Sequence, residues 1–164
     1  MTASPADSAS PRTPSIYWED FFVGQVREFG RYAVTREAVL AFAREFDPQP
    51  FHLDDAAAER SLFGRLSASG WHTCAMAMRM MCDAYLHDAA SLGSPGIEQL
   101  RWSHPVYPGD TLHVRLTVLE SRALASRPAV GLVRSNWTVM NQDDVTVLTM
   151  EGYGFFGRRA PAAT

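Results

Sequence analysis

Lysine is absent from the chain, because all 15 basic residues among its 164 are arginine. This absence excludes mechanisms that need a lysine amine, such as Schiff-base formation, pyridoxal phosphate anchoring and phosphate binding by a P-loop lysine. A basic surplus is missing as well, since 18 acidic residues leave a formal charge of -3. We therefore expect no nucleic-acid partner, because a phosphate backbone requires a basic footprint.

Cysteine and long apolar runs are also scarce. Cys74 and Cys82 lie eight residues apart, and they match neither a disulfide scaffold nor the spacing of a structural zinc site. No apolar run approaches the ~20 residues that span a membrane. The first residues lack the basic and apolar regions of a secretory signal. We therefore expect a soluble, cytoplasmic protein with no membrane partner.

The length favours a single domain, since domains usually have about 100–200 residues. We expect the folded domain to span residues 16–156. Residues 1–15 consist largely of Pro, Ser, Thr and Ala, and burial cannot offset the entropy of ordering them. They are predicted to form a disordered N-terminal tail, and residues 157–164 a C-terminal tail of similar composition.

The first part of this domain has helical patterns. The segment TREAVLAFAREF places apolar side chains on one helical face behind Thr35 as N-cap. Asp47-Pro48 ends this helix, because the residue before proline is pushed away from the α region. A short helix is expected after Asp54, ending near Gly64. The next segment, SGWHTCAMAMRMMCDAYL, is apolar on nearly all sides, which predicts a buried helix.

The last part of the domain has strand patterns, rich in Val, Leu, Thr and aromatic residues and separated by turn signals. The predicted strands are GIEQLRWSHPV, TLHVRLTVLESRAL, AVGLVRSNWTVMN and VTVLTMEGYGFF, and FVGQVREFGRYAV can add another. Short turns between long strands favour an antiparallel sheet. A curved antiparallel sheet wrapped around one long buried helix is the hot-dog fold, an α+β architecture.

The strongest candidate for chemistry is the loop from Asp47 to His52. Its acid and imidazole lie five residues apart, and the two prolines between them each have a nearly fixed φ, which makes the loop stiff. A carboxylate and a histidine held together can take a proton from water and return one elsewhere. The alternative is an Asx-type turn at Asp47 with a surface histidine at His52.

A second candidate lies where Ser69 and Gly70 lead into the long apolar helix. A helix N-terminus exposes unpaired N–H groups and a partial positive charge, which suit an anion or a polarised carbonyl. Gly70 allows a ligand to approach the backbone closely. Ser69 can also be an ordinary N-cap, and the two interpretations are compatible.

Two other patterns are set aside. Residues 152–157 match GxGxxG, but no helix follows them, so they are interpreted as the end of the last strand. His72, Cys74, Cys82 and His87 share the long helix. His72 and Cys74 are two residues apart and point away from each other on a helix, so we expect no metal site.

Taken in order, these residues resemble the MaoC-like dehydratases, which include the (R)-specific enoyl-CoA hydratases. The resemblance spans residues 17–156 and has several matches. They are Phe42-Ala43, Asp47-x-x-Pro50-x-His52-x-Asp54-x-x-x-Ala58, Phe63-Gly64, Ala68-x-Gly70 and Pro105-Val106-x-Pro108-Gly109-Asp110-Thr111-Leu112.

This resemblance implies a hot-dog protein that forms a homodimer or a higher homo-oligomer. It implies that Asp47 and His52 are the catalytic pair, which activates one water for addition across the α,β double bond of an enoyl-CoA thioester. The N–H of Gly70 would hold the thioester carbonyl. No metal or redox cofactor is then required, because coenzyme A is part of the substrate. The expected activity is that of an enoyl-CoA hydratase or acyl dehydratase in fatty acid metabolism.

Three residues depart from the family pattern. Gln49 replaces a common Asn, Ser69 a common His, and Trp71 a smaller apolar residue. We place all three beside Gly70 in the substrate-binding site, where Gln49 would alter how the loop or a water is held and Trp71 would narrow the acyl pocket. Two alternatives stay open: a thioesterase of the same fold, which attacks C1, and a non-catalytic acyl-CoA-binding or assembly module.

Overall fold

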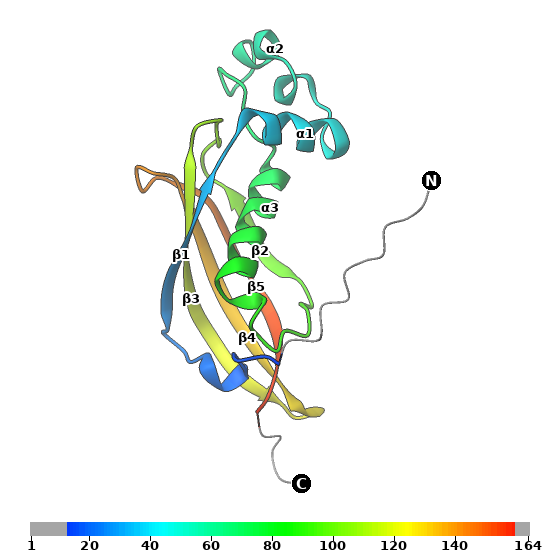
Figure 1. The fold of residues 1–164 in the computed structure, drawn as a ribbon, viewed down its shortest axis with the longest axis vertical. Helices are drawn as coiled ribbons and strands as arrows, with labels where there is room; N and C mark the ends of the chain where they lie inside the picture. Colours follow the sequence, from blue (N-terminus) through cyan, green and yellow to red (C-terminus); the bar gives the residue numbers. More distant parts are fainter. Residues whose placement is uncertain (1–12, 160–164) are drawn as a thin grey trace, which may run out of the picture.

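A single antiparallel sheet and one long helix form the centre of the computed structural model (Figure 1). The structure describes residues 13–159, so the parts of the two predicted tails at residues 1–12 and 160–164 lie outside the described residues. The strands are β1 (Val26–Ala33), β2 (Ile97–Trp102), β3 (Thr111–Leu124), β4 (Arg127–Met140) and β5 (Thr146–Gly157). The α-helices are α1 (Arg36–Phe46), α2 (Asp55–Glu59) and α3 (Gly70–Met81).

The strand order is β1-β3-β4-β5-β2, and every pairing is antiparallel, as predicted. Alternate residues of β3 are buried, because successive side chains of a strand point to opposite faces. These buried residues are Leu112, Val114, Leu116 and Val118. They belong to the same apolar core as Met76, Ala77 and Met80 of α3. The sheet therefore presents one apolar face to the helix.

One side of α3 is not covered by the part of the chain that the structure describes. The helix buries His72, Thr73, Met76, Ala77, Met80 and Met81. Trp71 and Met78 are 60% and 49% exposed, and Ala75 is exposed as well. The sequence predicts burial on nearly all sides, whereas the sheet covers a single side (Figure 1). Among residues 13–159, nothing covers this apolar stripe of α3.

Helices α1 and α2 lie at the N-terminal end of α3 (Figure 1). The hydroxyl of Thr35 accepts the N–H of Ala38 at 3.2 Å, which confirms the predicted cap of α1. Asp54 caps α2 in the same way, since its carboxylate accepts the N–H of Ala57 at 2.8 Å. Helix α1 buries Val39 and Ala43 only, and Phe46 on its predicted apolar face is 65% exposed.

Some element ends differ from the sequence pattern: α2 ends at Glu59, before the predicted end near Gly64. Strand β4 begins at Arg127, two residues before the predicted strand AVGLVRSNWTVMN, and therefore contains Pro128. Strand β5 runs to Gly157 and contains the whole GxGxxG match. Among the described residues, no helix is long and apolar enough to cross a membrane.

Candidate active site

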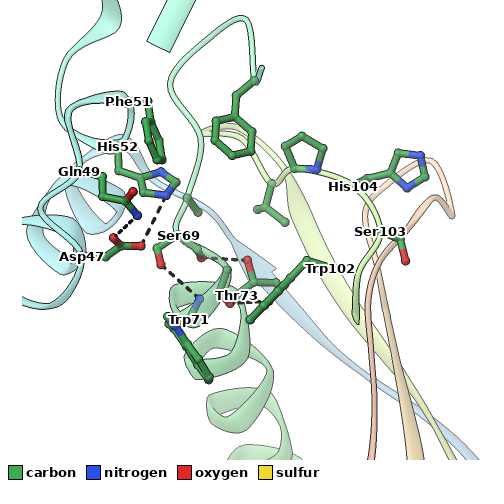
Figure 2. A pocket seen from close by; sticks show the side chains of 15 residues that line it. Asp47, Gln49, Phe51, His52, Ser69, Trp71, Thr73, Trp102, Ser103 and His104 are labelled. Atoms are coloured by element: carbon green, nitrogen blue, oxygen red, sulfur yellow. Dashed lines mark hydrogen bonds and ion pairs between the residues drawn. The ribbon is translucent and has the colours of Figure 1, made fainter. Parts of the chain in front are cut away.

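A cavity of about 360 Å³ opens at the N-terminal end of α3 (Figure 2). It lies between the loop that follows α1, the first turn of α3 and the segment that follows β2. The six residues that the sequence predicts for the site all line this cavity: Asp47, Gln49, His52, Ser69, Gly70 and Trp71. The fold therefore brings together two loops that are separated in the chain.

Asp47 and His52 face each other across the start of the cavity. Nε2 of His52 lies 3.5 Å from Oδ2 of Asp47. Nδ1 of the same ring lies 2.8 Å from the carbonyl oxygen of Ser67. Because a carbonyl only accepts, Nδ1 of His52 carries a proton and donates it in a hydrogen bond to Ser67, which fixes the orientation of the ring. His52 is only 4% exposed, so the alternative of a surface histidine is wrong.

Several groups act on the carboxyl of Asp47. The side-chain amide of Gln49 donates to Oδ1 at 2.7 Å. Burial raises the pKa of Asp47, but hydrogen bonds from Ser69 and Gln49 and the nearby His52 outweigh this effect and hold the pKa below its ordinary value. Asp47 is therefore ionised at neutral pH, and it can accept a proton.

The first turn of α3 has a side-chain N-cap at Ser69 and, among the described residues, an unpaired backbone N–H at Gly70. The hydroxyl of Ser69 accepts the N–H of Trp71 at 3.2 Å, so the ordinary capping role is confirmed. Within residues 13–159, the N–H of Gly70 has no hydrogen-bond partner. Since Gly70 lines the cavity, this N–H is available to a ligand oxygen.

Trp102 is a site residue that the sequence reasoning missed. Its indole Nε1 donates to the carbonyl oxygen of Gly70 at 2.9 Å, and a Cβ at Gly70 would lie 2.6 Å from Cε2 of the indole. The Trp102 ring also meets Trp71 edge to face, with 5.3 Å between ring centroids. Position 70 therefore needs glycine because of a neighbour 32 residues away. One indication of this role was present in the sequence, because Trp102 lies just before the Pro105-Val106 match to the family pattern.

The residues considered for a metal lie apart from this cavity. His72 stacks on Phe42 with 4.7 Å between ring centroids, and burial lowers its pKa. Burial also raises the pKa of Cys74, in spite of a hydrogen bond with Trp102. Across the described part of the chain, no three His, Cys, Asp or Glu side chains gather as metal ligands would.

The site thus offers an ionised carboxylate, a buried imidazole and, within residues 13–159, an unpaired backbone N–H in one cavity. The first two can move a proton, and the third can stabilise an oxygen that gains negative charge. Phe51 and Phe63 lie against His52, with centroid distances of 4.7 and 5.7 Å, and they shield one side of the ring.

Comparisons with known proteins agree on one family. A model of the MaoC like domain matches residues 21–139. The crystal structure of a MaoC-like dehydratase from Rhodospirillum rubrum is 41% identical with a TM-score of 0.82, covering 89% of this chain and 99% of that one. The R-hydratase PhaJ1 from Pseudomonas aeruginosa is 27% identical with a TM-score of 0.70, covering 88% and 87%. The uncharacterized protein YdeM of Bacillus subtilis is 27% identical over 133 residues, which is 81% of this chain and 93% of YdeM.

Proposed function

The chain belongs to the MaoC-like domain family, and from this premise we propose that it is a hydro-lyase acting on the α,β double bond of an enoyl-CoA thioester. The observation that carries the proposal is the convergence of Asp47, His52 and the free N–H of Gly70 on one cavity. The similarity to proteins named as a dehydratase and an R-hydratase supports the same reaction type.

In the hydration direction, Asp47 and His52 bind one water between them. The pair removes one proton from this water while its oxygen forms a bond to Cβ. The electrons of the double bond move towards the thioester carbonyl, whose oxygen gains negative charge beside the N–H of Gly70. The pair then delivers one proton to Cα, so the site ends in its starting protonation state. Dehydration follows the same steps in reverse.

The oxyanion donor and the proton transfer should each contribute substantially to the rate of the proposed reaction. A preorganised oxyanion donor is worth ~3 kcal/mol. Positioned proton transfer adds about two to four powers of ten in rate. The proposed reaction requires no metal or redox cofactor, since the coenzyme A is part of the substrate. Activity should therefore survive dialysis against EDTA, and a loss that added metal restores would contradict this part of the proposal.

The experiment is an absorbance assay with crotonyl-CoA, in which hydration removes the conjugated thioester absorbance and free thiol is followed in parallel. Wild type should lose absorbance without releasing thiol. Asp47→Asn and His52→Ala should each lower kcat by at least ~100-fold with the fold unchanged. Asp83→Asn and His87→Ala provide a matched control, because these exposed side chains form another Asp–His pair, 3.9 Å apart, outside the cavity.

Three results would overturn the proposal. Full activity in both Asp47→Asn and His52→Ala would show that the pair is not catalytic. Release of thiol without hydration would indicate the thioesterase alternative. Absence of turnover across a panel of short, branched and aromatic enoyl thioesters would favour the non-catalytic module.

We also propose that the protein is a homodimer, formed through the open side of α3 and the free edge of β2. Strand β2 ends the sheet, so one row of its backbone groups lacks a neighbouring strand within the described chain. Apolar side chains continue from this edge to the helix: Ile97 and Trp102 are 52% and 46% exposed, beside exposed Trp71 and Met78. An unpaired edge next to an apolar patch is typical of an interaction surface.

Sedimentation velocity tests this assembly. Wild type should sediment as a dimer or larger, and Ile97→Lys with Met78→Glu should shift it to the monomer. Phe22→Lys is the control, since Phe22 is exposed outside this surface and its replacement should leave the assembly intact. A monomeric wild type at micromolar concentration would refute the homodimer.

A further inference from the structure

We propose that Gln49 is a positioning residue, which fixes the orientation of the Asp47 carboxylate relative to His52. The inference rests on the proposed function, because it assigns to Gln49 a part in that same reaction. The amide of Gln49 donates to Oδ1 of Asp47 at 2.7 Å. The other carboxylate oxygen, Oδ2, is the one that faces Nε2 of His52 at 3.5 Å. One carboxylate oxygen of Asp47 therefore accepts the hydrogen bond from Gln49, while the other is directed at His52.

The carboxylate of an aspartate needs such a partner. Its terminal torsion joins an sp³ to an sp² carbon, and torsions of this kind are broad and roughly two-fold instead of being confined to sharp wells. The carboxylate of Asp47 would rotate over a wide range without a donor to hold it. A hydrogen bond to one oxygen stops this rotation and keeps the other oxygen directed at the reacting water.

The backbone of Gln49 makes the arrangement rigid. Its N–H donates to the carbonyl oxygen of Asp47 at 2.8 Å, and its own carbonyl accepts the N–H of His52 at 2.9 Å. Pro48 and Pro50 flank it, each with a restricted φ. Gln49 is thus hydrogen-bonded through its backbone to both members of the catalytic pair and through its side chain to one of them.

The side chain of Gln49 turns back over this short bridge to reach Asp47 (Figure 2). Ser69 lies at the same carboxyl, coming from the first turn of α3, and it also favours the ionised form. Gln49 and Ser69 are two of the three positions at which the chain departs from the family pattern. Both side chains act on the carboxyl of Asp47, from two separate segments of the chain, so the two departures are linked through this one group.

Substitutions of Gln49 separate positioning from substrate binding. Gln49→Ala should lower kcat about 10- to 100-fold with KM changed less than about twofold, because a hydrogen bond to a charged group is lost. It should also raise the pKa of Asp47, because a donor to the ionised form is lost, and this rise is seen as a shift of the acid limb of the pH–rate profile. Gln49→Glu keeps the shape but replaces the donor with an acceptor, so its upward shift should be larger. Gln49→Asn keeps an amide and should recover part of the lost kcat.

An NMR titration of the Asp47 carboxyl carbon, assigned with Asp47→Asn, gives a readout that does not require turnover. Gln142→Ala is the matched control, because the Gln142 amide also donates to an aspartate, Asp110 Oδ1 at 3.2 Å, outside the cavity. This control should leave the pKa of Asp47 and the pH–rate profile unchanged, even if it lowers stability.

Two results would overturn the inference: an unchanged pKa of Asp47 in Gln49→Ala, or a rise in KM with kcat unchanged, which would make Gln49 a substrate-binding residue. A different result separates it from the proposed function. If Gln49→Ala shifts the pKa of Asp47 but wild type hydrates no enoyl thioester, the hydro-lyase proposal fails while the control of Asp47 by Gln49 is supported.

Discussion

Gly70→Ala tests the close approach of Trp102 to the start of α3. A Cβ at position 70 would lie 2.6 Å from Cε2 and 2.8 Å from Nε1 of the indole, closer than non-bonded atoms allow. The indole would have to move, and its hydrogen bond to the carbonyl oxygen of Gly70 would be lost or lengthened. The substitution therefore perturbs packing, a hydrogen bond and the free N–H of the cavity together.

The expected change in the free energy of unfolding combines two costs and one gain. Overpacking of this kind costs about 1–3 kcal/mol, and the lost hydrogen bond adds roughly 0.5–1.5 kcal/mol. The better helix propensity of alanine returns at most about 1 kcal/mol. The free energy of unfolding should thus fall by about 0.5–4.5 kcal/mol, with a Tm lower by about 2–4 °C for each kcal/mol in a chain of this size. Moving the N–H of position 70 by about 1 Å should cost ~100-fold in kcat.

Urea denaturation and the crotonyl-CoA assay measure the two effects on the same preparation. Trp102→Ala provides the decisive background, because it removes the atoms that the new Cβ would meet. Gly70→Ala should cost less than about 1 kcal/mol there, giving a coupling between the two sites of the size expected for residues in contact. Equal costs of Gly70→Ala in both backgrounds, or no cost in either, would refute the packing argument.

Two further predictions concern the core. Gly30→Ala should cost more stability in urea denaturation than Gly64→Ala. Both positions have a positive φ, of 85° and 70°, but a Cβ at Gly30 would lie 2.9 Å from Cγ of Met80, whereas a Cβ at Gly64 would enter open space. Equal costs for the two substitutions would contradict this prediction. Burial raises the pKa of Tyr85 to about 12 against an ordinary value of 10.0, so the folded state favours the neutral phenol. The stability from this effect is complete below pH ~10 and is lost as the pH rises towards ~12. Alkaline unfolding should follow the phenolate absorbance, and Tyr85→Phe should remove that component.

Local signals in the sequence predicted most of the elements. The caps at Thr35 and Asp54 and the stop before Pro48 depend on neighbouring residues only, and the structure places all three as expected. The alternation in β3 was visible because one face of the strand is buried in the core. The loop from Asp47 to His52 was identified for a similar reason, since its prolines and its two polar residues lie within one short segment.

The features that could not be predicted depend on contacts between distant segments. Trp102 is a site residue because a turn of helix 32 positions earlier brings Gly70 against it. The exposure of Phe46 follows from how little of α1 contacts the rest of the fold, which helical periodicity does not reveal. The open stripe on α3 has the same origin. An apolar helix segment predicts burial but does not tell whether the covering surface belongs to the same chain.

The short segment between Ser67 and Gly70 has a consequence for how this fold can acquire new substrates. The carbonyl of Ser67 orients His52, and three residues later the N–H of Gly70 faces the cavity. In the proposed mechanism, the segment that orients the proton-transfer residue therefore also carries the N–H that stabilises charge, and three residues of chain, at roughly 3.3 Å per extended residue, separate the two contacts. The side chain of Trp71 lines the same cavity and is exposed, so its replacement can change the shape of the cavity without altering that separation. Substrate preference can thus diverge in evolution while the geometry of the reaction is inherited unchanged.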